Sequence, residues 1–440
     1  MSITDSKIIG CKVHGYIRVS PLALKIIDTK EFQRLRDIKQ LGLCHYIYPS
    51  ATHTRFEHSI GVYYLTCKMA KILQKKYPDR IYDIPELGPT KLTDFIVELI
   101  KIAGLCHDIG HGPFSHIFDD ILLEIDPTNP NIYHEVRSCL ITEQICRRTL
   151  SDVLSQSHIK FIQSVINPGP THTGAIYQIV SNHLNGIDVD KFDYLARDAY
   201  TLGLKRGFDP RKVINEIIID KQGNIAYAKH CSIEIYDMFQ TRYMMHKQVY
   251  NHRGTKIIES MVRDILLKVN PIFGIFNSIN SMEKFCVFTD NTVFHMIDTV
   301  INMPSYFTSD LTTSLLADVV AANNIYQNIC QRKLYKCVAD ISDRPIEYVN
   351  AFLDCVQNSD IQVITTHIGF VSGNKKNPFD SIYFYDKKDF TSCVLDKKQI
   401  SMIMCDTYTE TRHLVICKNI QIHAELVSKY EEFVASYDSI

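Results

Sequence analysis

Apolar positions recur at helical spacing along most of the chain and change to a strand-like alternation towards its C-terminal end. The helical spacing predicts a mainly α architecture with small β-hairpins. Beyond about residue 340, apolar and polar residues alternate between turn-forming glycine and Asn-Pro positions, which indicates strands. We therefore expect two domains, a helical major lobe over residues 1–335 and a smaller C-terminal α/β lobe over residues 336–440.

Capping and breaking residues set the ends of the predicted elements. Thr29 is a typical helix N-cap, Gly42 is a typical helix stop, and Pro78 ends a long helix that begins at Arg55. The predicted helices span about 21–27, 30–41, 55–77, 93–107, 133–150, 152–166, 176–202 with a break at Gly186, 233–269 and 423–436. The predicted strands lie in hairpins over 7–19 and 212–229 and in the segments 361–370, 381–395 and 411–421.

The composition is that of a globular protein with balanced charge. Of the 440 residues, 45% are hydrophobic and 22% are charged, and the formal net charge is -1. This balance argues against nucleic acid as the main partner, because binding through bulk charge needs a basic excess. No apolar run reaches the roughly 18 residues that a membrane span needs.

The N-terminal residues and the cysteines indicate the compartment. The first 20 residues are too rich in charge for a signal peptide. The 14 cysteines are scattered without a CxxC pair, which is typical of reduced thiols. We therefore expect an intracellular protein, cytoplasmic or nuclear, that has no membrane partner.

The segment from Gly104 to His116 carries the densest chemistry of the chain. His107 and Asp108 directly follow an apolar run, and His111 and His116 come soon after. An adjacent histidine and aspartate can offer one nitrogen and one oxygen to the same metal ion. Glycines and a proline end the predicted helix here, so the later histidines can point into the space that the metal faces. The cluster as a whole therefore predicts a metal-dependent hydrolase.

Two further ligand candidates lie elsewhere in the chain. His58 comes early in a predicted helix, and Asp190 shares one helical face with Tyr194 and Asp198 through i, i+4 and i+8 spacing. Two imidazoles and two carboxylates suit iron, manganese, nickel or zinc. The competing interpretation is structural, since a single buried histidine is usually a core residue and a helical aspartate usually caps or faces water.

Long stretches of the chain resemble one family. The chain resembles the HD-domain phosphohydrolases and, among them, the deoxynucleoside triphosphate (dNTP) triphosphohydrolases that in vertebrates carry a sterile-alpha-motif domain. The resemblance runs from about residue 7 to 430 and rests on the segments Ile26–Gly42, Arg55–Ser59, Ile102–His116, Asn185–Asp198, Tyr236–Phe239 and Lys376–Pro378. We expect no counterpart of the sterile-alpha-motif domain, because the sequence starts at the HD core.

The resemblance implies a metal site and a catalytic cluster. The implied metal ligands are His58, His107, Asp108 and Asp190, and the implied catalytic residues are His111, His116, Asp119 and His134. Because the leaving 5′-oxygen needs a proton, we expect His116 to act as the general acid, oriented by Asp119. His111 and His134 are then expected to bind phosphate oxygens, with Mg²⁺ as a further candidate there.

The resemblance also implies how a deoxynucleotide would bind. The sequence has no GxxxxGK[ST] loop, so side chains and metal must hold the phosphates. Gln40 and Asp198 match residues that bind the 3′-hydroxyl, and Leu41 matches one that packs under C2′, where a 2′-hydroxyl would be left unpaired. The remaining implied substrate residues are Arg55, Lys191 and Arg242 for phosphate, Tyr194 for the sugar, and Tyr250 and Asn251 near the base, with Asn251 standing where the family has Gln.

Activator sites follow from the same resemblance. The implied guanine-nucleotide site consists of Lys7, Asp28, Gln33, Arg36, Arg332 and Lys336, and the implied second, deoxynucleotide site of Ile47, Tyr48, Asp209, His252, Arg253 and Lys418. The second site is less well kept, because Gly10, Lys212, Ala228 and His230 replace the family's residues. Without the resemblance, Asp28, Gln33 and Arg36 would be interpreted as a solvated helix face.

The expected function is hydrolysis of dNTPs to deoxynucleoside and inorganic triphosphate, activated by a guanine nucleotide in a homo-oligomer, a dimer or a tetramer. A different HD-domain enzyme, such as a phosphodiesterase or 5′-nucleotidase, is one alternative. A non-catalytic protein that binds nucleotides or nucleic acid is the other. The full ligand set argues against loss of catalysis, and the near-zero net charge argues against nucleic acid.

Overall fold

The computed structural model describes residues 6–204, 208–303, 313–370, 377–402, 404 and 406–437. The fold is mainly helical with small sheets, as the sequence predicts. The chain forms two compact units: the first contains residues 1–241, 276–293 and 376–404, and the second contains residues 242–275, 294–375 and 405–440. The predicted domain division at residue 335 stays a prediction, and Lys376 lies outside the described residues.

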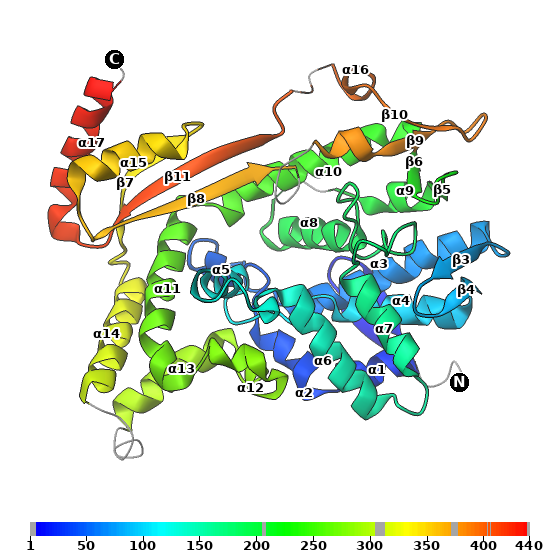
Figure 1. Ribbon diagram of the computed structural model, residues 1–440, viewed down its shortest axis with the longest axis horizontal. Helices are drawn as coiled ribbons and strands as arrows, with labels where there is room; N and C mark the ends of the chain where they lie inside the picture. Colours follow the sequence, from blue (N-terminus) through cyan, green and yellow to red (C-terminus); the bar gives the residue numbers. More distant parts are fainter. Residues whose placement is uncertain are drawn as a thin grey trace. The chain divides into compact units, whose positions relative to one another are not determined.

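The first unit carries most of the helices (Figure 1). Its helices are α1 (Pro21–Ile27), α2 (Lys30–Gln33), α3 (Arg55–Lys76), α4 (Asp94–Cys106), α5 (His116–Ile125), α6 (His134–Thr149), α7 (Gln156–Ile166), α8 (Val189–Thr201), α9 (Pro210–Asn215), α12 (Met282–Phe285) and α16 (Lys397–Ile400). α10 (Ser232–Met245) and α13 (Asp290–Asn302) begin in this unit and continue into the second. The long helix α3 packs against both α4 and α8, and α4 also packs against α7.

Among the described residues, three small sheets complete the first unit. Strands β1 (Lys7–Cys11) and β2 (Gly15–Val19) form an antiparallel hairpin, as do β3 (Ile81–Ile84) and β4 (Gly88–Lys91). The third sheet has the order β10–β9–β6–β5, from β5 (Ile217–Ile219), β6 (Ile225–Ala228), β9 (Tyr383–Tyr385) and β10 (Ser392–Val394). β6 and β9 pair in parallel, so this sheet joins two segments that are distant in the sequence.

The second unit contains an antiparallel sheet with the strand order β7–β11–β8. Its strands are β7 (Lys336–Ser342), β8 (Ile361–Gly369) and β11 (Thr409–Cys417), and its helices are α11 (Arg253–Phe273), α14 (Thr313–Cys330), α15 (Ile346–Val356) and α17 (His423–Tyr437). α15 and α17 share a buried core with the sheet, in which Val349 and Phe352 pack with Val415 and Leu426. The predicted strands 361–370 and 411–421 and the predicted helix 423–436 are confirmed, with small shifts at their ends.

The structure corrects four predicted helices. The predicted helix 30–41 ends at Gln33 and continues as a 3₁₀ turn, because residues 38–40 pair with residues 53–55 in an extended ladder. Only the second half of 176–202 is helical, since Gly186 has a positive φ and Asp188 caps the new helix α8. The helix 233–269 is interrupted by a π turn over His246–Tyr250. The helix 152–166 starts at Gln156, where Ser155 forms a capping box.

The hairpin at 7–19 and the buried helix near 93–107 are confirmed. Among the described residues, no helix combines the length and the apolar character that crossing a bilayer requires. The described cysteines are all free thiols.

Candidate active site

The four predicted metal ligands converge in the first unit. His58 comes from the start of α3, His107 caps the end of α4, and Asp108 follows it. His58 Nε2 lies 3.2 Å from His107 Nε2 and 3.0 Å from Asp190 Oδ1, which belongs to the first turn of α8. Asp108 Oδ1 lies 3.4 Å from His107 Nε2, and Asp190 Oδ1 lies 3.3 Å from the same nitrogen. Helices far apart in the sequence thus bring two nitrogens and two carboxylates to one place.

The second nitrogen of each imidazole fixes the ring orientation. His58 Nδ1 lies 2.8 Å from Asp193 Oδ2, and His107 Nδ1 lies 2.9 Å from the Gly104 carbonyl oxygen, so both Nδ1 positions donate. With Nδ1 committed as a donor, Nε2 of each ring is the atom that faces the carboxylates and could bind a metal. Asp193 is itself held by Arg197 at 2.7 Å and by His14 at 2.6 Å.

Sequence reasoning missed these supporting residues. Asp193 and Arg197 stand four residues apart on α8, a spacing typical of an intrahelical ion pair, and this was a usable signal. His14 gives no such signal, because it reaches Asp193 from the turn between β1 and β2. All three side chains are buried or nearly so, which makes the carboxylate behind His58 part of the built site.

Charge at this cluster favours a cation. Burial lowers the pKa of His58, but Asp190 and Asp193 outweigh burial and raise it to about 10. Asp108 and Asp190 likewise outweigh burial and raise the pKa of His107. The pKa of Asp190 is lowered, since the nearby imidazoles outweigh its own burial. Imidazole and carboxylate ligands with this orientation fit a divalent first-row metal, which would replace the protons that the imidazoles hold beside these carboxylates.

A second cluster lies beside the first and contains His111, His116, Asp119 and His134. Their ligand-type atoms lie within 4.8 Å of one another. The His111 ring stacks on His134 with centroids 3.8 Å apart, and His116 meets both rings edge-on at 5.2 and 5.8 Å. His111 Nε2 lies 3.4 Å from Asp108 Oδ1, so the two clusters are in contact.

One expected pairing in this cluster is wrong. Asp119 was expected to orient His116, but its carboxylate accepts a hydrogen bond from His134 Nδ1 at 2.8 Å and pairs with Arg137. His134 and Arg137 stand three residues apart on α6 and face α5 together, so Asp119 has two cationic partners across the helices. Of its hydrogen bonds among the described residues, none reaches His116.

The two clusters differ in protonation. Burial, followed by the charge of Arg55, lowers the pKa of His116 to about 4 and holds the pKa of His111 well below its ordinary value. Burial also acts on His134, but Asp119 outweighs it and raises the pKa. The second cluster therefore contains two neutral rings and one imidazole that keeps its proton more firmly.

The loop between the clusters is strained and tightly bound. Phe114 and Ser115 have φ values of 61° and 62°, which non-glycine residues rarely adopt. Buried Asp290 accepts backbone hydrogen bonds from Phe114 at 2.7 Å and from Lys39 at 2.9 Å, and Arg55 donates to Ser115 Oγ at 3.1 Å. Asp290 is another residue that the sequence did not reveal, because its partners lie far away in the chain.

Two buried arginines hold the same loop from another direction. Arg34 donates to the carbonyls of Ile109 and His111, at 3.4 and 2.7 Å. Arg137 donates to the intervening carbonyl of Gly110 at 2.8 Å. A Cβ on Gly110 would lie 2.2 Å from the His134 carbonyl oxygen, so only glycine fits there.

The structure also places the residues expected to bind the substrate. Arg55 is buried and pairs with Asp108. Asp198 is buried and lies 2.7 Å from His53, and the Gln40 side-chain oxygen is buried without a hydrogen-bond partner among the described residues. Lys191 Nζ lies 6.0 Å from the ring centre of Tyr194 on the same helix. Leu41 directly precedes the 3₁₀ turn Gly42–Tyr46.

Three expected substrate residues belong to the second unit, and their roles stay predictions. The Arg242 guanidinium donates to the Gly369 carbonyl, and the Asn251 carbonyl accepts from Arg412 at 2.8 Å. The Tyr250 ring lies edge-on to His246 at 4.7 Å.

Four of the expected activator residues line one cavity of about 530 Å³ in the first unit, namely Lys7, Asp28, Gln33 and Arg36. The Arg36 guanidinium lies 3.6 Å from the ring centre of Phe56 and donates to Gln33 Oε1 at 2.7 Å. The other two residues of this expected site, Arg332 and Lys336, belong to the second unit.

The residues of the expected second activator site are divided in the same way. Ile47, Tyr48 and Asp209 belong to the first unit, and His252, Arg253 and Lys418 to the second. Asp209 caps α9 and pairs with Arg211, while Lys418 pairs with Asp264 at 2.7 Å.

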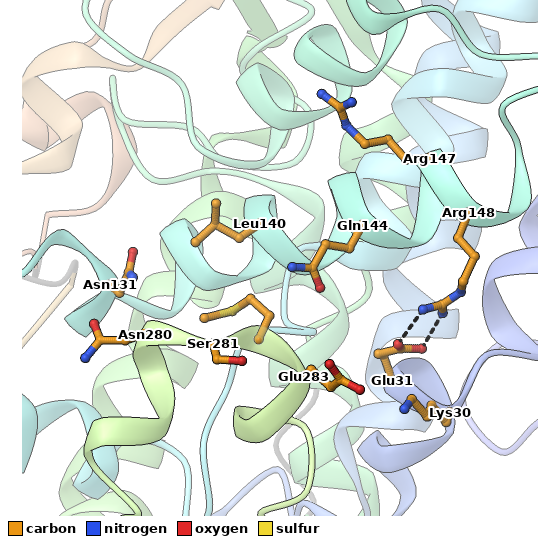
Figure 2. A pocket seen from close by; sticks show the side chains of 11 residues that line it. Lys30, Glu31, Asn131, Leu140, Gln144, Arg147, Arg148, Asn280, Ser281 and Glu283 are labelled. Carbon is orange, nitrogen blue, oxygen red and sulfur yellow. Dashed lines mark hydrogen bonds and ion pairs between the residues drawn. The ribbon is translucent and has the colours of Figure 1, made fainter.

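A larger hollow of about 860 Å³ contains none of the expected site residues. Its wall combines α6, residues 280–283 and the start of α2, and Figure 2 shows Arg148 on α6 reaching Glu31 through two hydrogen bonds of 2.9 and 2.8 Å. Its lining contains three cationic side chains, two carboxylates and three amides, so it favours no single ligand charge.

Known proteins are similar in amino-acid sequence to this chain over nearly its whole length. The family model described as "HD domain" matches residues 55–198, which contain both clusters. The chain is 50% identical over 429 residues to "Putative HD domain-containing protein L394" of Acanthamoeba polyphaga mimivirus, covering 95% of this chain and 93% of that protein.

Relatives in cellular organisms carry a more specific name. "Deoxynucleoside triphosphate triphosphohydrolase SAMHD1" of Danio rerio is 32% identical, over 95% of this chain and 72% of its own length. The SAMHD1 homolog of Dictyostelium discoideum is 31% identical, over 99% of this chain and 82% of its own length. The sequence coverage and the His–Asp cluster together make the chain a member of the HD-domain family, a phosphohydrolase related to the dNTP triphosphohydrolase SAMHD1.

Proposed function

We propose that this protein hydrolyses dNTPs to deoxynucleoside and inorganic triphosphate. The observation that carries the proposal is that one loop, residues 107–116, supplies side chains to a metal-type cluster and to a histidine cluster in contact with it. The deoxynucleoside triphosphate triphosphohydrolase activity in the names of the SAMHD1 relatives supports the choice of substrate.

The chemistry divides between the two clusters. A divalent metal held by His58, His107, Asp108 and Asp190 would supply a water of lowered pKa and neutralise phosphate charge. We expect His111 and His134, whose rings stack in the second cluster, to bind phosphate oxygens. Arg55 contributes a fixed positive charge beside Asp108.

His116 remains our choice as the acid that protonates the leaving 5′-oxygen. Its pKa of about 4 leaves the ring neutral at pH 7. A triphosphate with about four negative charges beside the ring would raise that pKa towards the range a general acid needs. His134, which Asp119 keeps protonated more readily, is the competing acid. The alkaline-side pKa of the rate profile, above which a general acid has lost its proton, should disappear in His116→Ala and persist in His134→Ala if His116 has this role.

Sugar selection would come from Leu41, Gln40 and Asp198. An apolar side chain under C2′ leaves a 2′-hydroxyl unpaired, which disfavours ribonucleotides. The unpartnered oxygen of Gln40 and the buried carboxylate of Asp198 are acceptors suited to the 3′-hydroxyl.

The main experiment identifies the products. Protein loaded with manganese or iron is incubated with dGTP, with and without GTP, and the products are separated by anion exchange. We expect deoxyguanosine and inorganic triphosphate, and no turnover by His107→Ala. Stepwise release of dGDP and dGMP would instead favour another HD-domain activity, and nucleotide binding without turnover would favour a non-catalytic role.

We further infer that the cavity lined by Lys7, Asp28, Gln33 and Arg36 takes a guanine nucleotide. Asp28 can accept from the guanine N1 and N2 groups, while Lys7 and Arg36 supply positive charge. The second activator site is expected to be weaker, because Ala228 stands where a phosphate-binding arginine is expected. Binding at sites of this kind would assemble a homo-oligomer, whose state mass photometry with GTP and each dNTP would measure.

The activator proposal predicts an asymmetric effect of two arginine substitutions. Arg36→Ala should raise the GTP concentration for half-maximal activation roughly tenfold, the loss of one charged contact. Arg147→Ala, at the hollow of Figure 2, is the matched control and should leave activation unchanged. Equal effects of the two substitutions would contradict a guanine-nucleotide site in the cavity near Arg36.

A further inference from the structure

His53 connects the two residues that are proposed to read the 3′-hydroxyl. The residue is 2% exposed, and its Nε2 lies 2.7 Å from Oδ1 of Asp198, which is 1% exposed. Its backbone carbonyl accepts a hydrogen bond from the Gln40 backbone N–H at 3.0 Å. One residue therefore holds the Gln40 backbone through its main chain and the Asp198 carboxylate through its ring.

The surrounding ladder fixes His53 in this position. The Arg55 N–H donates to the Ile38 carbonyl at 3.0 Å, and Lys39 pairs with Thr54, so residues 38–40 and 53–55 form a short antiparallel pair. This pair leads directly into α3, whose first turns carry Arg55 and the metal-ligand candidate His58. The His53 ring extends from this ladder to α8, so it links two separate parts of the proposed site.

Polar atoms at this place are poised for a ligand. Gln40 Oε1 and His53 Nδ1 are both buried, and neither has a hydrogen-bond partner among the described residues. A buried polar atom without a partner costs about 1–3 kcal/mol, so native proteins seldom leave one unless something else satisfies it. If Nε2–H donates to Asp198, Nδ1 is an acceptor, and a hydroxyl donor would find several acceptors around it.

We propose that His53 is a positioning residue that holds Asp198 and the Gln40 segment in the arrangement that recognises the sugar 3′-hydroxyl. This inference rests on the proposed dNTP hydrolysis and extends it by one residue. Because the ring donates to the carboxylate, Asp198 can direct its remaining lone pairs at the sugar only while His53 holds it.

The test compares dGTP with 2′,3′-dideoxy-GTP, which lacks the 3′-hydroxyl. The measured quantity is the ratio of kcat/KM for dGTP to kcat/KM for the dideoxy analogue. His53→Ala should lower this ratio roughly tenfold, the effect of one lost hydrogen bond to a charged group, while the dideoxy reaction changes much less. Both substrates are measured on the same preparation, so a fraction of unfolded protein does not alter the ratio.

Two further variants separate positioning from general structural damage. His53→Gln, whose amide N–H can take the place of Nε2–H, should recover most of the ratio, whereas His53→Asn, whose shorter amide mimics Nδ1, should not. His172→Ala removes another histidine–carboxylate pair, 2.8 Å from Glu86, and should leave the ratio unchanged. In the double variant His53→Ala/Asp198→Ala, the ratio should fall no further than in Asp198→Ala alone.

The inference is overturned if His53→Ala lowers both reactions equally, or if the two substitutions act multiplicatively on the ratio. A wild-type protein that turns over neither nucleotide would instead refute the proposed hydrolysis. The same ratio, taken from dissociation constants for dGTP and 2′,3′-dideoxy-GTP, then decides the role of His53.

Discussion

Buried histidines of the two clusters, His58 in one and His116 in the other, occur in opposite electrostatic states. At the metal-type cluster, Asp190 and Asp193 outweigh burial and raise the pKa of His58 to about 10. In the second cluster, burial and Arg55 lower the pKa of His116 to about 4. The comparison shows that the number and placement of carboxylates, rather than burial itself, decides whether a buried imidazole attracts a cation or remains neutral.

The largest expected effect separates the clusters by metal content. His107→Ala should lose the metal and reduce activity roughly a thousandfold or more, because the nucleophile is lost with the metal. His134→Ala should retain the metal while also losing most of its activity. Elemental analysis of the purified proteins measures the metal, and His172→Ala serves as the control. Equal metal loss in both variants would show that the two clusters form a single metal site.

The next effect tests the carboxylates that stand behind the rings. Asp193→Asn removes the anion that holds His58, and metal affinity should fall roughly 10–100-fold. Asp119→Asn makes the matched change behind His134 and should leave metal affinity within about twofold of wild type. Competition with a chromogenic chelator measures both. If Asp119→Asn weakens metal binding as strongly, the second cluster contributes to the metal site.

The smallest effect concerns acid stability. A histidine whose folded pKa is about 4 and whose unfolded pKa is about 6.5 binds its proton better when unfolded, so its stability contribution is lost as pH falls from about 6.5 towards 4. His116→Gln removes this titrating group. Between pH 7 and pH 5, the free energy of unfolding of the variant should therefore fall by about 2 kcal/mol less than that of wild type. Urea unfolding at the two pH values measures the difference. An identical loss in both proteins would show that His116 is not neutral in the folded state.

The sequence indicated the metal-ligand candidates of the first cluster better than the residues that hold them in place. The adjacent His107 and Asp108 and the helical spacing of Asp190 identified ligand types, because local spacing determines which face a side chain occupies. Asp290 and His14 could not be found in this way, since each meets its partners only after distant segments pack. The expected pairing of Asp119 with His116 was wrong for a related reason. The two residues are close within α5, but His134 and Arg137 from α6 bind the Asp119 carboxylate instead.

The errors in the fold have similar causes. The apolar pattern of residues 30–41 suits a helix, but pairing with residues 53–55 took the end of the segment into an extended ladder. The turns over 176–188 end where the Asp188 side chain accepts from the Lys191 N–H and starts α8. In both places tertiary hydrogen bonds or a helix cap outweighed the helical spacing of apolar residues. The strongly apolar α4, in contrast, forms the helix that this spacing predicts.

The arginines behind the loop of residues 107–116 limit how that loop can move. Arg34 and Arg137 engage the carbonyls of three consecutive residues, from Ile109 to His111. No peptide plane in this stretch can flip without leaving a buried guanidinium N–H unsatisfied. A lysine could not replace either arginine, since one ammonium cannot span two separate carbonyls in a fixed fork. The backbone from Ile109 to His111 is therefore a rigid template, which fixes the point from which the His111 side chain extends.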